Sequence, residues 1–108
     1  MLSKRRRELK ETLRQSALER LGRAASALYR EGAEDVLAFG SILKPAEFNE
    51  RSDVDIAVKG ISENKRHRVL TMLEDIFADI LFALVFLGGE LRPEVRARIQ
   101  KEGTRGKP

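Results

Sequence analysis

Two aspartates one residue apart are the most chemically informative feature of this 108-residue sequence. Asp53 and Asp55 lie in "DVDIAV", an apolar stretch that predicts a β-strand. Because residues i and i+2 of a strand point to the same face, the two carboxylates are expected to lie side by side. Carboxylates this close repel each other, and no basic residue stands directly beside them. A hard divalent cation, Mg²⁺ or Mn²⁺, would relieve that repulsion, since it prefers carboxylate oxygens.

A glycine–serine pair stands at the end of the preceding apolar run, "DVLAFGS". Gly40 allows the backbone to approach a ligand closely. The N–H groups that follow it, together with the Ser41 hydroxyl, can hold phosphate oxygens. A phosphate-holding turn opposite metal-binding carboxylates is the arrangement used in phosphoryl and nucleotidyl transfer. The two motifs therefore predict a site for a Mg²⁺–nucleoside triphosphate, with ATP as the first candidate.

Taken together, "FGS…SDVDIAV" closely resembles the nucleotidyltransferases of the DNA polymerase beta superfamily, in particular the minimal, single-domain (MNT) type. The resemblance covers roughly residues 33–103 and includes the segment "LVFLGGELRPEVRARIQKEG". It implies a mixed sheet, nucleotide binding at Gly40 and Ser41, and catalytic, metal-binding roles for Asp53 and Asp55. It also implies a small helical HEPN protein as partner, in toxin–antitoxin or defence pairs, in some of which AMP is added to the partner.

The sequence departs from that family at a third carboxylate. The family usually carries it in a segment like "VDLVFL", whereas this chain has "FALVFL", with Ala83 at the matching position. Asp79 is the nearest acid, but along an extended strand at ~3.3 Å per residue it lies about 13 Å back, too far to reach the same metal ion. We expect Asp79 to be a solvent-exposed residue of a helix end or loop. Because the third carboxylate acts on the attacking hydroxyl group, its loss threatens turnover more than nucleotide binding.

The segment between the two motifs contains weaker candidates. Ser52 precedes the first aspartate of the motif, and Lys44 and Arg51 could contact phosphate, although a solvent-exposed loop is the more ordinary interpretation. The family often has Arg-Gly after the glycine–serine pair, whereas this chain has Lys44-Pro45 and a slightly longer loop. His67, the one histidine, lies in the charged stretch "KRHR" and is expected to be exposed.

Helices are expected on both sides of these motifs in the sequence. Apolar residues at three- and four-residue spacing predict a long helix over residues 3–30 and a second helix over residues 63–78. Ser3 and Ser62 are the expected N-caps, and Gly32 is the expected stop of the first helix. A short final helix is expected after Pro93, followed by a flexible tail over residues 104–108. The first helix is longer than so small a domain needs, so we expect it to form a partner or homodimer face.

The predicted fold class is α/β (α+β): one domain over residues 1–108, with a small mixed sheet flanked by helices. The sequence predicts three strands. Their ranges are 35–39, 53–58 and 80–87. The third is apolar throughout, so we expect it to be central in the sheet and covered on both faces.

Charge is unevenly distributed along the chain. Residues 1–30 carry nine basic residues against three acidic ones, residues 31–91 carry six against twelve, and residues 92–108 carry six against two. An acidic middle suits a site that holds cations, and the basic ends could meet phosphates or an acidic partner. Nucleic-acid binding through those ends is an alternative, but with one Tyr, five Phe and no Trp the chain offers few stacking partners.

The composition favours a cytoplasmic protein without a membrane anchor. The chain contains no cysteine, its basic start is not followed by an apolar signal-peptide core, and its longest apolar run is too short to span a bilayer. Three functions stay open on the sequence alone. The first is a nucleotidyltransferase acting on a protein partner; the second is a catalytically degenerate binding module or antitoxin of the same fold; the third is a nucleic-acid-binding module.

Overall fold

The centre of the molecule is a four-stranded mixed sheet, seen in a computed structural model that describes residues 2–88 together with 104 and 105. The strand order is β3-β2-β1-β4. β1 pairs antiparallel with β2 and with β4, whereas β2 and β3 run parallel. The predicted fold class, a small mixed sheet with flanking helices, is confirmed. The strands span β1 (Asp35–Phe39), β2 (Val54–Lys59), β3 (Phe82–Leu87) and β4 (Thr104–Arg105).

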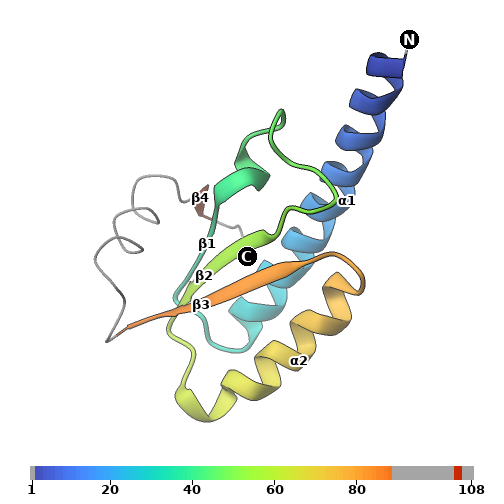
Figure 1. Cartoon of the computed structure of the whole chain (residues 1–108). Helices are drawn as coiled ribbons and strands as arrows, with labels where there is room; N and C mark the ends of the chain where they lie inside the picture. Colours follow the sequence, from blue (N-terminus) through green and yellow to red (C-terminus); the bar gives the residue numbers. More distant parts are fainter. Residues whose placement is uncertain (1, 89–103, 106–108) are drawn as a thin grey trace.

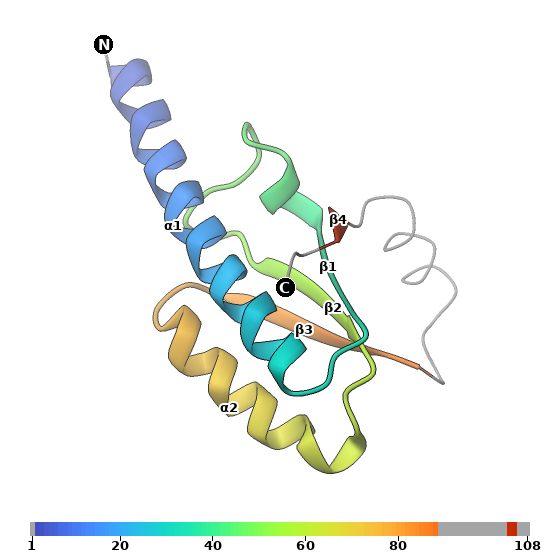
Figure 2. The ribbon, with the colours of Figure 1, turned by 180° about the vertical axis from the view of Figure 1, so that it is seen from behind.

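Both long helices cover the same face of this sheet. α1 (Leu2–Arg30) and α2 (Arg66–Phe77) lie side by side on it, as Figures 1 and 2 show from opposite sides. The N-terminal part of α1 extends beyond the sheet, and Leu9 on it is 65% exposed. The core between helices and sheet is continuous and apolar. Its largest fully buried side chains include Leu28, Val54, Ile56, Leu73 and Phe77.

Alternation along β2 separates the two faces of the sheet. Val54, Ile56 and Val58 are buried on the helix side. Asp55 and Ala57 point the other way because successive strand residues alternate. On that second face a smaller apolar cluster forms around Phe39 and Ala57, with Leu37, Val85 and Leu87 packed against it.

The prediction of a central position for the third strand is wrong. β3 pairs only with β2 in the described sheet, at its edge, and each of its six residues is only partly buried. Its apolar character has another cause. Phe82, Leu84 and Phe86 pack against the helix-side core, while Val85 and Leu87 join the cluster on the opposite face. An edge strand that contacts apolar clusters on both faces therefore has the same composition as a central one.

The helix ends differ in detail from the sequence prediction. α1 begins at Leu2, so Ser3 lies inside the helix and is not its N-cap. The second helix starts with a 3₁₀ turn, η2 (Glu63–Lys65), and the preceding Ser62 makes no side-chain capping hydrogen bond. The predicted stop at Gly32 is confirmed: α1 ends at Arg30, and Gly32 has a positive φ of 105°. Such a conformation favours glycine at helix ends.

The C-terminal predictions have mixed outcomes. The short helix expected after Pro93 lies outside the described residues. Thr104 and Arg105, expected in a flexible tail, instead pair with Ala38 and Leu37 as a short strand. Backbone pairing of two residues needs no distinctive side chain, so the composition of the segment did not predict it.

Candidate functional site

The two sequence motifs meet where β1 ends and β2 begins. Phe39, the last residue of β1, is the register partner of Asp55. The next residues of the chain, Gly40 and Ser41, open a 3₁₀ turn, η1 (Gly40–Leu43), which contacts β2 (Figure 1). Because the strands are antiparallel, the glycine–serine turn leaves β1 beside the first residues of β2. The predicted phosphate-holding turn and the aspartates therefore lie at the same end of the two inner strands of the sheet.

The backbone at Gly40 explains why a glycine stands there. Gly40 is buried and has a φ of 81°, a conformation that a residue with a side chain adopts only with strain. A hydrogen bond of 2.9 Å from the Lys44 N–H to the Ser41 carbonyl closes the turn. The Ser41 side chain is half-buried, and within the described residues its hydroxyl has no hydrogen-bond partner. Among the described residues, no side chain or backbone group therefore engages this hydroxyl.

An arginine of α1 holds this turn from behind. The Arg14 Nε donates a 3.0 Å hydrogen bond to the carbonyl of Ile42, and the Arg14 side chain is only 16% exposed. Ile42 itself is fully buried. Sequence reasoning missed this residue, because 28 positions separate the partners and α1 contains several arginines with similar neighbours. Arg14 positions the turn and does not face a ligand in this arrangement.

The two aspartates differ in their surroundings. Asp55 is half-buried within β2, between the register partners Phe39 and Ala83 on the neighbouring strands. Asp53 comes directly before β2 and is exposed. Alternation within β2 directs the Asp55 carboxylate to the face opposite the helices, but it does not apply to Asp53, which lies outside the strand. Asp53 is exposed, and the next side chain, Val54, is fully buried on the helix side.

Position 83 lies directly beside Asp55. Ala83 on β3 is its register partner in the parallel pair, and paired strands run about 4.8 Å apart. A carboxylate at this position would adjoin that of Asp55, whereas alanine provides no group for metal binding or proton transfer. Asp79 does not replace it. It is exposed, follows Ala78 with its φ of 55°, and lies three residues before β3 begins.

The weaker candidates lie in a loop that is folded on itself. The Ser52 Oγ accepts a 3.0 Å hydrogen bond from the Asn49 N–H, so this hydroxyl closes the loop. Lys44 is exposed and lies 3.9 Å from a carboxylate oxygen of Glu47. Neither residue is directed by these contacts toward the aspartates. Ser52 has a structural role, and Lys44 has a local ion pair.

Arg51 and His67 have no such role. Both are exposed. The Arg51 backbone N–H donates to the Asn49 Oδ1 at 2.8 Å, which leaves its side chain at the loop surface. For His67, the predicted exposure is confirmed. The loop as a whole is anchored to the core by Phe48, which is 1% exposed.

The residues of the site fit Mg²⁺ only together with a ligand. Within the described residues no group of three or more histidine, aspartate or glutamate side chains could hold a metal ion by itself. Mg²⁺, however, usually keeps water molecules and is held by one or two carboxylates plus substrate phosphates. Asp53 and Asp55 supply such a pair. The arrangement is therefore suited to a metal–nucleotide complex rather than to a resident metal ion.

Comparison with known proteins assigns no family to this chain. Neither the models of known protein families nor the curated proteins give a match to the sequence. In the described part of the chain, no helix is long and apolar enough to cross a bilayer.

Proposed function

We propose that this protein binds a Mg²⁺–nucleoside triphosphate, ATP in the first instance, and transfers the nucleotidyl group to a protein partner. The observation that carries this proposal is the pairing of Phe39 with Asp55. That pairing brings a glycine–serine turn and two carboxylates to the same end of β1 and β2. Neither motif is distinctive alone. Their combination at one end of these strands supplies both the phosphate-binding groups and the metal-binding carboxylates that a metal–triphosphate requires.

Each part of the site has a separate role in this proposal. The Ser41 hydroxyl and the N–H groups after Gly40 hold the terminal phosphates. The carboxylates of Asp53 and Asp55 hold the metal-bearing side of the triphosphate. When bound, Mg²⁺ supplies positive charge that stabilises the departing pyrophosphate. Arg14 keeps the turn in position through the Ile42 carbonyl.

In the transfer step a hydroxyl group of the partner attacks the α-phosphorus. The bond between this phosphorus and the oxygen that bridges to the β-phosphate breaks, and pyrophosphate leaves with the bonding electrons. The proton of the attacking hydroxyl passes to water, because Ala83 offers no base beside Asp55. A helical HEPN-type protein, in a toxin–antitoxin-like pair, is the partner that the resemblance of the motifs supports.

The register of β3 favours a second candidate function. Ala83 stands beside Asp55, where a third carboxylate would complete a catalytic site. A protein that binds the nucleotide but does not turn it over would act as a binding module or antitoxin of the same fold. Ala83→Asp separates the two candidates. A strong gain of nucleotidyl transfer in this variant indicates that the wild type is a degenerate enzyme. Efficient transfer by the wild type that the substitution leaves unchanged indicates that another group takes the role of the third carboxylate.

Isothermal titration calorimetry with ATP tests the site itself. We expect binding by the wild type that disappears when Mg²⁺ is omitted and is weakened at least about tenfold by Asp55→Asn. Asp75→Asn is the matched control, since it makes the same change at an exposed aspartate of α2, on the helix side of the sheet. Absence of ATP binding by the wild type, or equal weakening by both variants, would overturn the proposed function.

A further inference from the structure

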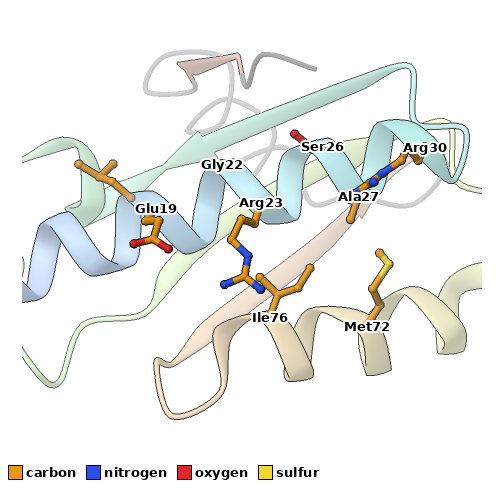
Figure 3. Close-up of a pocket in the computed structure, with 9 residues that line it drawn as sticks. Glu19, Gly22, Arg23, Ser26, Ala27, Arg30, Met72 and Ile76 are labelled. Carbon is orange, nitrogen blue, oxygen red and sulfur yellow. The ribbon is translucent and has the colours of Figure 1, made fainter.

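A long groove lies between the two helices, on their outer side. It has a volume of about 600 Å³, and the strands lie behind it (Figure 3). A second hollow of about 300 Å³ shares Ala27, Arg30 and Met72 with it and extends it toward Glu31. The lining positions on α1 therefore run from Leu18 to the helix end, a length of about 20 Å at 1.5 Å per residue. We call this surface the helix groove.

The floor of the helix groove is apolar, and it is recessed at Gly22, which has no side chain. Leu18, Met72 and Ile76 are partly buried along it, and Ala27 is buried. Gly22 is exposed on α1, and a Cβ atom built there would meet nothing within 4 Å. The missing side chain lets another backbone approach α1 closely. Such a floor suits side chains that stand at helical spacing on a partner.

One acidic and two basic side chains of α1 flank this floor: Glu19, Arg23 and Arg30. Arg23 and Arg30 are exposed and seven positions apart, so they lie two turns apart on one side of α1 (Figure 3). Within the described residues neither makes an ion pair or a hydrogen bond. Four other described cations differ in this respect, whereas the side chain of Arg51 does not. Carboxylate partners lie within 4 Å of Arg14, Lys44, Lys59 and Arg68.

We propose that the helix groove binds an acidic amphipathic helix of a partner protein. Apolar side chains at i, i+4 and i+7 would fill the floor, and carboxylates beside them would pair with Arg23 and Arg30. The elongated shape fits a helix of about fourteen residues better than a compact ligand. This surface is separate from the nucleotide site, which faces the opposite side of the sheet, and the proposal does not depend on that site.

The charge of the first 30 residues argues against the α1 of a second copy as the occupant. The first 30 residues carry nine basic residues against three acidic ones, so the α1 of another copy would bring positive charge to the arginines. Nucleic acid would satisfy the arginines, but its phosphates would gain nothing from the apolar floor. An acidic helix satisfies both parts of the surface.

Fluorescence anisotropy with a stapled helical peptide tests this proposal on the full chain. The peptide has about fourteen residues, leucines at i, i+4 and i+7, and glutamates on both sides of them. Its control has lysines in place of the glutamates. We expect the acidic peptide to bind with a dissociation constant in the micromolar range, and the basic peptide to bind at least about tenfold more weakly.

Substitutions in the helix groove test whether the peptide binds there. Gly22→Leu places a large side chain in the groove from a position where a Cβ atom meets nothing within 4 Å, and we expect it to weaken binding at least about tenfold. Gly22→Ala adds only a methyl group and should leave binding nearly unchanged. The double variant Arg23→Glu/Arg30→Glu should have the same effect as Gly22→Leu. Arg51→Glu is its control, because it reverses another exposed arginine, in the loop before β2. Circular dichroism verifies that each variant keeps the fold.

Four results would overturn the proposal. No binding of the acidic peptide up to about 1 mM would remove its basis. Binding that Gly22→Leu leaves intact would place the peptide elsewhere. Equal competition by a single-stranded oligonucleotide of the same charge would indicate a nonspecific basic surface. Self-association of the wild type that Gly22→Leu abolishes, measured by analytical ultracentrifugation, would make a second copy the occupant.

Discussion

The two faces of the sheet are built in different ways. On the helix side, fifteen buried residues of the described chain form one continuous core, whereas the smaller cluster on the opposite face contains two. Asp55 lies on that second face, where its neighbours are the strand residues Phe39 and Ala83. Packing therefore stabilises the first face, and backbone geometry at the strand ends positions the site on the second. Substitutions on the two faces should affect different properties.

Phe77→Ala should have the largest effect on stability. Phe77 is fully buried on the helix side, and its ring stacks on Phe82 with 4.9 Å between ring centroids. Truncation leaves a cavity, so we expect the free energy of unfolding to fall by about 3–5 kcal/mol in urea denaturation. Phe39→Ala on the opposite face is the comparison, with a loss at least about 1 kcal/mol smaller. Equal losses would show that the two faces contribute alike.

Arg14→Met tests whether the helix side positions the site. It removes the bond to the Ile42 carbonyl, and we expect a loss of about 1.5–3 kcal/mol in unfolding free energy together with weaker Mg²⁺–ATP binding. Arg20→Met is the matched control. Arg20 donates a 2.8 Å bond to the Ile76 carbonyl, near the end of α2, and not to the glycine–serine turn. If both variants weakened ATP binding equally, Arg14 would be a structural residue only.

Gly40→Ala should affect both properties, because it changes the backbone of the turn itself. With φ at 81°, an alanine is strained, and we expect a loss of about 1–2 kcal/mol in unfolding free energy. The turn relieves part of the strain by moving, so Mg²⁺–ATP binding in calorimetry should also weaken. Ser41→Ala provides the contrast: we expect it to weaken binding with almost no change in stability. Normal ATP binding by Gly40→Ala would show that the glycine–serine turn does not contribute to the nucleotide site.

Local pattern was enough to predict much of the fold and part of the site. β1 spans the predicted residues, and Asp55 lies within the predicted second strand, but Asp53, predicted inside that strand, lies directly before it. The place of β3 in the sheet was predicted wrongly, because an apolar run does not specify how many neighbours a strand has. Long-range contacts were not predictable for a related reason. The bond from Arg14 to Ile42 and the pairing of β4 with β1 depend on the folded chain.

Gly22→Ala should have the smallest effect on the free energy of unfolding, and it should raise this free energy where the other variants lower it. Gly22 lies inside α1 in open space, so alanine should raise the free energy of unfolding by about 0.5–1 kcal/mol through its better helix propensity. Gly32→Ala is the matched control, because a Cβ atom there also meets nothing within 4 Å, but its φ is 105°. We expect that variant to lose about 1 kcal/mol. If both substitutions destabilised the protein, the loss at Gly22 would have to come from crowding on the outer side of α1. Backbone conformation would then not explain the difference between the two positions.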